Sequence, residues 1–218
     1  MRDRDIHRMI SSLKREVPKW KTPVVGEIAR RTRDPFKVLV STLLSLRTQD
    51  ATTAAAAGRL FSLAGDPEAM LLLSRRQIEQ AIYPVGFYRT KARNILAICR
   101  ELLDRFHGAV PDQIDLLLTL EGVGRKTANL VVTVGFSKPG ICVDTHVHRI
   151  SNRWGYVKTK TADQTEQVLR KKLPPRYWIP YNDYLVAFGQ NVCRPTAPIC
   201  STCSIRPYCD RVGVLRSR

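Results

Sequence analysis

Four of the six cysteines lie within 17 residues near the C-terminal end of the chain. Their spacing is Cys193-x6-Cys200-x2-Cys203-x5-Cys209. Pro195, Pro198 and Pro207 fall among them, and prolines at this density exclude a regular helix. A loop that turns around one point is what four thiolate ligands require. The segment therefore predicts a metal-binding loop.

The spacing also bears on which metal the loop binds. Zinc sites with four cysteines usually contain two Cys-x2-Cys pairs, whereas this segment contains one. A cubane [4Fe–4S] cluster accepts unequal spacers, because each thiolate binds a different corner. We therefore expect a [4Fe–4S] cluster, with zinc as the alternative. Cys99 and Cys142 lie in apolar surroundings and are expected in the core.

The charge of the chain indicates a polyanionic partner. Thirty-six Lys and Arg residues against 19 Asp and Glu residues give a formal net charge of +17. Such an excess attracts nucleic acid through counterion release and long-range steering. The alternative is a solvated basic surface without a specific partner.

Helical patterns repeat along the chain, and strand patterns are scarce, so an all-α fold is expected. Residues 36–46 could form an apolar strand, but they continue into the alanine-rich segment 50–57, which favours two buried helices with a polar break at 47–50. An amphipathic helix is expected from residue 6 to residue 17. Further helices are expected near 67–73, 75–82, 89–106, 112–119, 126–135, 144–154, 162–172 and 177–190.

The N-terminal residues 1–5 do not lead into the apolar core of a signal peptide. No apolar run approaches the roughly 18 residues that span a bilayer. We therefore expect no membrane association and an intracellular protein, in a prokaryotic cytoplasm and associated with the nucleoid through DNA. Structural disulfides are not expected in that compartment.

Residues 116–130 have the pattern of a helix-hairpin-helix. A helix ends near Leu120, a tight turn covers Glu121-Gly122-Val123-Gly124, and a second helix begins at Arg125 or Lys126. The two glycines permit positive φ and the close approach of another backbone. The free N–H groups at the start of the second helix form a site for a DNA phosphate. The alternative is a purely structural turn.

Lys126 stands in the first turn of that second helix. The positive end of the helix dipole and the neighbouring Arg125 both favour an uncharged amine, which can attack a sugar carbon and form a Schiff base. On this residue alone, a lysine that contacts a phosphate is the simpler interpretation.

Asp144 lies 18 residues downstream, at the apparent start of another helix. Helix capping by itself would select an aspartate there. The capping role and a catalytic role are compatible, because a capped carboxylate is fixed in orientation. His146 and His148 form an isolated His-x-His, which is weak evidence for a metal, and His146 is expected to orient a neighbour or to lie in the core.

These segments resemble the endonuclease III family of the helix-hairpin-helix glycosylase superfamily. The resemblance rests on three motifs in order: Leu-Glu-Gly-Val-Gly-Arg-Lys-Thr-Ala-Asn at 120–129, Val-Asp-Thr-His-Val-His-Arg at 143–149, and the 6-2-5 cysteines. It extends from about residue 24 to residue 209. It implies a two-domain all-α fold, with a six-helix barrel at 27–138 and a [4Fe–4S] domain formed by 1–26 together with 139–218.

The resemblance also implies an activity. Lys126 matches the catalytic lysine of the family, and Asp144 matches its catalytic aspartate. The implied enzyme is a bifunctional DNA glycosylase and AP lyase of base excision repair, which removes oxidised pyrimidines such as thymine glycol from double-stranded DNA. Monofunctional relatives carry residues such as serine or tyrosine at the position of Lys126, so the lysine favours coupled strand cleavage. A monomer is expected.

Two segments depart from the family pattern. Arg47 stands where the family usually has the glutamine that fills the gap left by the flipped nucleotide, and Gln49 is a shifted candidate for that role. Phe87 stands where the family inserts an apolar wedge, usually leucine, and core packing is the alternative for it. Arg194 and Arg206, in the cysteine loop, are expected to face the DNA backbone.

Two other functions stay open at this point. One is a glycosylase of the same fold that acts on mismatched or otherwise damaged bases. The other is a DNA-binding module that carries the cluster but has no activity, in which Lys126 binds a phosphate and Asp144 only caps a helix.

Overall fold

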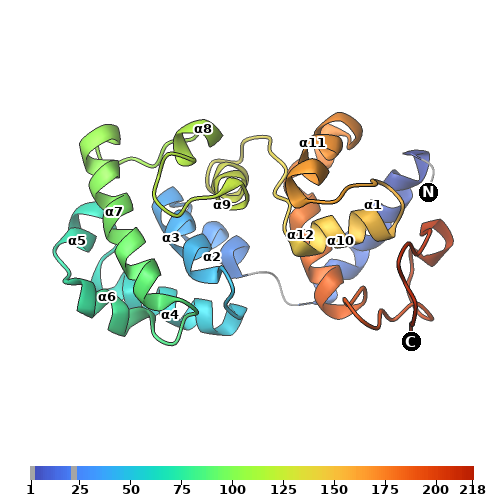
Figure 1. The fold of residues 1–218 in the computed structure, drawn as a ribbon, viewed down its shortest axis with the longest axis horizontal. Helices are drawn as coiled ribbons and strands as arrows, with labels where there is room; N and C mark the ends of the chain where they lie inside the picture. Colours follow the sequence, from blue (N-terminus) through green and yellow to red (C-terminus); the bar gives the residue numbers. More distant parts are fainter. Residues whose placement is uncertain (1–2, 21–23) are drawn as a thin grey trace. The chain divides into compact units, whose positions relative to one another are not determined.

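The structure is a computed structural model that describes residues 3–20 and 24–218. Residues 1–2 and 21–23, which fall in the predicted domain segment 1–26, lie outside the described residues. Within the described ranges the regular elements are all helices, which confirms the all-α prediction (Figure 1). None of the described helices is long and apolar enough to cross a membrane.

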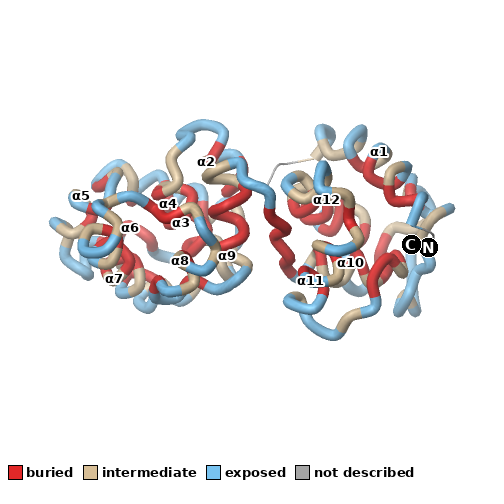
Figure 2. Tube along the Cα trace, turned by 90° about the horizontal axis from the view of Figure 1, so that it is seen from above, coloured by how far each residue is buried: buried red, intermediate tan, exposed pale blue. Residues whose placement is uncertain are grey.

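The chain divides into two compact units. One is continuous and covers Val24–Lys138, and the other combines Met1–Pro23 with Pro139–Arg218. In each unit the buried segments lie inside, beneath exposed loops and helix faces (Figure 2). The predicted role of residues 1–26 and 139–218 as a cluster domain stays a prediction.

The continuous unit is a set of helices around one central helix. Its elements are α2 (Val24–Thr32), α3 (Pro35–Ser45), α4 (Asp50–Leu63), α5 (Pro67–Leu71), α6 (Arg75–Ile82), α7 (Tyr88–Phe106), α8 (Ile114–Leu117), α9 (Arg125–Leu130) and a π-helical turn at Val131–Gly135. The central helix α3 contacts α2, α4, α7, α9 and the π turn.

The start of α3 explains why the apolar stretch 36–46 is a helix. The Asp34 side chain accepts hydrogen bonds from the backbone N–H groups of Phe36 and Lys37, and Pro35 occupies the first helical position. Eight residues of α3 are buried, because neighbouring helices cover it on nearly every side. A helix that is apolar all round is therefore stable here.

The second unit packs α1 (Ile6–Glu16) against the C-terminal half of the chain. Its other helices are α10 (Thr145–Arg153), α11 (Ala162–Lys172) and α12 (Trp178–Asn191), with short 3-10 turns at Asp3–Asp5, Val17–Lys19, Pro175–Tyr177 and Arg206–Tyr208. The apolar face of α1 is buried and α1 contacts α12, so segments from opposite ends of the sequence share one core (Figure 1). Its largest fully buried side chains include Trp154, Tyr181 and Phe188.

The structure differs from the sequence-based expectation at three places. The helix α2 was not expected, because Gly26 and its nine-residue length weaken its pattern. The expected helix 126–135 changes to a π turn after Leu130. The expected helix 112–119 is the single turn α8.

Candidate functional site

The hairpin between α8 and α9 is a tight turn closed by the backbone N–H of Val123, which donates to the carbonyl of Leu120 at 3.1 Å. Gly122 has φ +77°, a conformation that other residues adopt only with strain. A Cβ added at Gly122 would lie 2.2 Å from Nδ2 of Asn94 on α7. Gly122 is therefore favoured by its positive φ and by the close approach of the Asn94 amide on α7.

Gly124 differs from Gly122 in both respects. Its φ is −95°, so the expected positive φ applies to Gly122 alone. No heavy atom lies within 4 Å of a Cβ added at Gly124, and the residue is exposed. Its carbonyl accepts the first backbone hydrogen bond of α9, from Ala128 at 2.9 Å. The surface beside this helix start is therefore open to a ligand.

Lys126 is the second residue of α9 and is half-buried, while Arg125 beside it is exposed. The four residues that follow, 127–130, are all buried and anchor the helix in the core of its unit. The lysine side chain thus extends from a short helix whose position is fixed by packing. The structure places Lys126 directly after the hairpin, as the sequence predicts.

Asp144 is the N-cap of α10 and is 9% exposed. Its Oδ1 accepts a hydrogen bond of 2.8 Å from the backbone N–H of Val147. Oδ2 takes no part in the cap. The carboxylate is therefore buried and fixed in orientation, as the capping interpretation requires. Lys126 belongs to the continuous unit and Asp144 to the other.

His146 is the second residue of α10 and contacts Arg149 on the same helix. Its Nδ1 is 3.2 Å from Nη2 of Arg149, and the same Nη2 donates to the carbonyl of Cys193 at 3.0 Å. The backbone of α12 approaches the ring closely, since a Cβ at Gly189 would lie 2.2 Å from Nδ1 of His146. The imidazole therefore lies close both to the backbone of α12 and to the Arg149 guanidinium.

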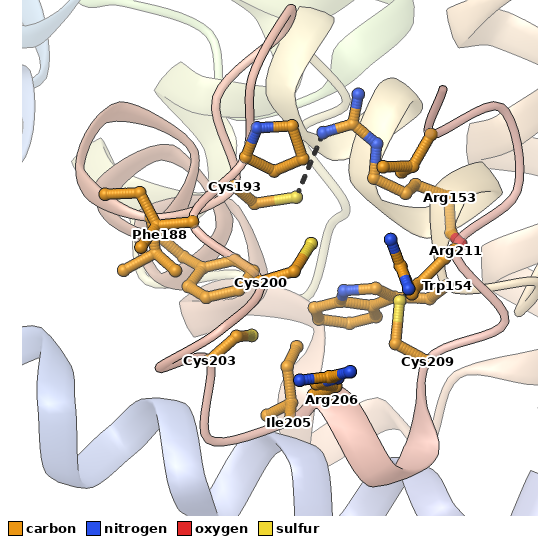
Figure 3. A pocket seen from close by; sticks show the side chains of 14 residues that line it. Arg153, Trp154, Phe188, Cys193, Cys200, Cys203, Ile205, Arg206, Cys209 and Arg211 are labelled. Atoms are coloured by element: carbon orange, nitrogen blue, oxygen red, sulfur yellow. Dashed lines mark hydrogen bonds between the residues drawn. The ribbon is translucent and has the colours of Figure 1, made fainter. Parts of the chain in front are cut away.

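The four cysteines of the C-terminal loop line one pocket, which is partly open to solvent (Figure 3). Trp154, Phe188 and Ile205 supply apolar surface to the same pocket. All six cysteines of the chain are free thiols, and Cys99 and Cys142 are buried in the core as expected. The structure thus brings the four sequence-predicted ligands together around a common space.

Arg153, at the last position of α10, holds the cysteine loop. Its guanidinium donates to the Cys193 sulfur at 3.3 Å and to the carbonyls of Arg194 and Pro195 at 2.8 and 2.9 Å. Its own carbonyl accepts from the Cys209 thiol at 3.7 Å. Sequence reasoning missed this residue, and its only signal is a basic residue at the end of a helix that precedes the loop.

Two of the pocket thiols, Cys203 and Cys209, are poor anions on their own. Burial, together with the neighbouring cysteines, raises the pKa of Cys203 to about 11, and the same causes raise the pKa of Cys209. A cationic centre between the thiols would reverse this shift, because metals bind the thiolate form. No three His, Cys, Asp or Glu residues in the described segments are grouped closely enough for a single metal ion. The Arg153 guanidinium beside these thiols would offset the negative charge of any thiolate-bound centre.

Arg47 and Phe87 are neighbours in space. Phe87 is 60% exposed, which contradicts the alternative that it packs in the core. The guanidinium carbon of Arg47 lies 5.6 Å from the centre of the Phe87 ring. Gln49 is exposed as well and is the N-cap residue of α4. Arg194 and Arg206 are exposed on the cysteine loop.

Comparisons with known proteins agree with these features. The sequence model described as "HhH-GPD superfamily base excision DNA repair protein" matches residues 40–175. Endonuclease III of Thermotoga maritima is 46% identical over 177 residues, which are 81% of this chain and 83% of that protein. Endonuclease III of Escherichia coli K12 is 36% identical over 176 residues, again 81% and 83% of the two chains.

Solved structures give the same result. A trapped endonuclease III–DNA covalent intermediate has a TM-score of 0.87 and 33% identity, and the match covers 97% of each chain. A thermostable thymine-DNA glycosylase matches with a TM-score of 0.77 at 24% identity, which is a likeness of fold. The chain belongs to the endonuclease III family, within the HhH-GPD superfamily of base excision DNA repair proteins.

Proposed function

We propose that this chain is a bifunctional DNA glycosylase and AP lyase that removes oxidised pyrimidines of the thymine glycol type, with Lys126 as its nucleophile and Asp144 as the assisting carboxylate. The single observation that carries this assignment is the position of Lys126. It is a half-buried amine on a packed helix, directly after a hairpin whose outer face is open. Endonuclease III of Thermotoga maritima, at 46% identity, supports the same assignment.

The hairpin binds the phosphates of the DNA backbone. The first backbone N–H groups of α9 have no partner inside the helix, and the helix dipole makes this end positive. Gly124 leaves room for a phosphate to approach these groups, and Arg125 adds a charge beside them. Gly122, Val123, Gly124 and Arg125 thus bind phosphate without regard to base sequence. The net charge of +17 steers the protein to double-stranded DNA.

The chemistry takes place at Lys126 once the damaged nucleotide has left the helix stack. The amine attacks C1′, and the glycosidic bond breaks with its electron pair leaving on the base, which takes up a proton. An amine proton is transferred to O4′ as the C1′–O4′ bond opens, which gives a protonated Schiff base and a free O4′ hydroxyl. A proton then leaves C2′, and the C3′–O bond breaks with its electrons going to the 3′ phosphate. Water hydrolyses the imine and frees Lys126.

Asp144 assists the first of these steps. A carboxylate can accept a proton from the lysine ammonium or stabilise positive charge that develops on the sugar. The cap through Oδ1 and the burial of the residue keep the carboxylate in one orientation. His146, held against α12, limits the space available beside α10.

The stacked bases around the lesion are contacted by Arg47, Gln49 and Phe87. An exposed phenyl ring can insert between bases, and an exposed guanidinium or amide can bond to the base left without its partner. Because Arg47 carries a charge where relatives usually have glutamine, we expect it to affect which opposite base is preferred.

Cys193, Cys200, Cys203 and Cys209 would hold a [4Fe–4S] cluster. When bound, the cluster supplies a rigid crosslink of the C-terminal loop, and no bond-making step is assigned to it. Arg194 and Arg206 extend from this loop and provide cations for the DNA backbone. The expected observation is a brown protein with about four irons and four sulfides per chain by chemical analysis. A colourless protein with one zinc per chain would contradict the assignment.

The activity is tested on a duplex that contains one thymine glycol. Each time point is divided, and one half is heated in alkali to reveal every released base as a strand break. For the coupled enzyme, strand breaks before and after alkali accumulate together. Breaks that appear only after alkali would mean a monofunctional glycosylase. No breaks under either condition, together with cleavage of a duplex with a plain abasic site, would mean a different base substrate.

Lys126→Gln separates the enzyme from a non-catalytic DNA-binding module. The variant loses the nucleophile while α9 and the hairpin keep their packing, so we expect it to bind damaged duplex and release no base. If the wild-type protein, folded and loaded with its cluster, also releases no base and cuts no abasic site, the binding module is the correct function. The proposed setting for this activity is nucleoid DNA in a prokaryotic cytoplasm, with a monomeric enzyme.

A further inference from the structure

Lys91 is a buried lysine, 7% exposed, in the first turn of α7. Its ammonium donates to the carbonyl of Leu44 at 2.9 Å, to the carbonyl of Leu46 at 2.6 Å and to the hydroxyl of Thr48 at 3.3 Å. These three acceptors match the three donors of an ammonium. All three belong to the last turn of α3 and the segment that follows it, where the negative end of the helix dipole favours a cation.

The same network reaches the turn that precedes α7. The Thr48 hydroxyl also accepts from the backbone N–H of Gly86 at 3.2 Å. The two backbones touch there, because a Cβ added at Gly86 would lie 2.7 Å from the carbonyl oxygen of Arg47. Lys91 and Thr48 therefore tie the turn at 46–49 to the turn at 83–87.

Each of these turns presents one exposed residue with an unusual backbone. Arg47 has φ +53° and Phe87 has φ +57°, both in the left-handed region that favours glycine. Non-glycine residues stay in this region only where their surroundings fix them, and such residues gather at functional sites. The two side chains are in contact at the protein surface, with the Arg47 guanidinium over the Phe87 ring.

We infer that Lys91 is a positioning residue that holds Arg47 and Phe87 together as a single two-residue probe for insertion into DNA at the lesion. This inference rests on the proposed function. Lys91 touches neither DNA nor the reacting sugar. Its charge is used inside the protein, to fix two turns that are 40 residues apart in the sequence, so that the probe is formed before DNA arrives. Because preorganised groups lose less entropy on binding, a fixed probe displaces a base at lower cost than two mobile side chains.

The test removes the ammonium and compares two substrates. Lys91→Met keeps an unbranched side chain and loses the donors, and Arg100→Met, at an exposed position of the same helix, is the matched control. One substrate is the thymine glycol duplex, which requires base displacement. The other is a single-stranded abasic oligonucleotide, on which borohydride trapping measures Schiff base formation without displacement of a paired base.

For Lys91→Met we expect base release from the duplex to fall by about tenfold or more, and trapping on the single strand to stay at the wild-type level. In a duplex with 2-aminopurine opposite a stable abasic analogue, fluorescence on binding should rise less than with wild type. Arg100→Met should match wild type in all three assays. Equal losses on both substrates, or no loss on the duplex, would overturn the inference.

A second variant covers the case in which Lys91→Met does not fold. Thr48→Val keeps the ammonium and its two carbonyl partners but removes the hydroxyl that connects the two turns, and the same split between duplex and single strand is expected. A Thr48→Val protein with wild-type activity on the duplex would overturn the inference. If wild type itself forms no trapped adduct on the thymine glycol duplex, the proposed function fails, which is a separate outcome.

Discussion

At the scale of single residues, the Asp144 carboxylate is assigned two roles, helix capping and the proposed chemistry. Oδ1 caps α10 through the backbone N–H of Val147, and the burial of the residue keeps the group in place. A cap needs only a side-chain oxygen, and asparagine provides one as well as aspartate does. The proposed chemistry needs the negative charge. The two demands can therefore be separated by substitution.

Asp144→Asn is expected to keep the cap and lose the activity. The free energy of unfolding should stay within about 1 kcal/mol of wild type, because asparagine is an equally good cap and only part of the helix-dipole term is lost. Base release in single turnover should fall by about 10²- to 10⁴-fold. Urea unfolding and single-turnover kinetics measure the two quantities.

The control for this experiment is Thr161→Ala. The Thr161 side chain caps α11 by accepting from the backbone N–H of Gln164, so its loss should cost about 1 kcal/mol and leave base release unchanged. If Asp144→Asn releases base at the wild-type rate, Asp144 only caps a helix.

Also at this scale, burial of the Lys91 ammonium lowers the free energy of unfolding. Burial lowers its pKa from 10.5 to about 8. The unfolded chain therefore binds this proton more tightly than the folded chain between about pH 8 and pH 10.5, and stability from this group rises with pH over that range. Below about pH 8 both states carry the charge and the folded state bears the full cost of its burial.

The measurement is the difference in free energy of unfolding between wild type and Lys91→Met, taken by urea titration at several values between pH 7 and pH 10. Groups that the two proteins share cancel in this difference. We expect the difference to move in favour of wild type as the pH rises above about 8. A difference that is constant across the range would mean that the ammonium is not desolvated in the folded protein.

At the scale of elements, α10 and α12 are held at close range by a glycine. A Cβ at Gly189 of α12 would meet Nδ1 of His146 at 2.2 Å and the side chain of Ile150 at 3.0 Å. An imidazole ring cannot move aside as the end of a flexible chain can. The two helices could reach their present distance only without a side chain at position 189.

Gly189→Ala is therefore expected to lower the free energy of unfolding by about 1–3 kcal/mol, as overpacking does in other cores. Gly58→Ala is the matched control, because Gly58 lies inside α4, is exposed, and has no heavy atom within 4 Å of an added Cβ. It should stabilise the protein by about 0.4–1 kcal/mol through helix propensity and a less flexible unfolded chain. Destabilisation by both substitutions to the same extent would contradict the close approach of α10 and α12.

The elements also show what a sequence can predict. The helix α3 follows from an apolar run that continues into alanines, and Pro35 after Asp34 marks its start. The helix α2 was not predicted, because it is short and contains Gly26. The π turn after Leu130 was not predicted either, because its apolar residues fit an ordinary α-helix equally well. Patterns of hydrophobicity therefore predict long buried helices better than short or irregular ones.

At the scale of the whole molecule, the candidate site depends on residues that lie far apart in the chain. The hairpin, Lys126, Asp144 and the four cysteines can be proposed from the sequence, because each belongs to a compact local motif. The contact between Arg47 and Phe87 could not be proposed from the sequence. It depends on the buried Lys91, which in the sequence resembles any lysine on a helix. Arg153 was missed for the same reason, because its partners lie about 40 residues away.

The measurement that tests the central claim most directly is borohydride trapping on a thymine glycol duplex, followed by mass analysis of the crosslinked peptide. Borohydride reduces the Schiff base to a stable amine and so marks the nucleophile. We predict a covalent adduct with wild type, on a peptide in which Lys126 carries the sugar, and no adduct with Lys126→Gln. An adduct on another lysine, or one that persists in Lys126→Gln, would contradict the assignment of Lys126 as the nucleophile.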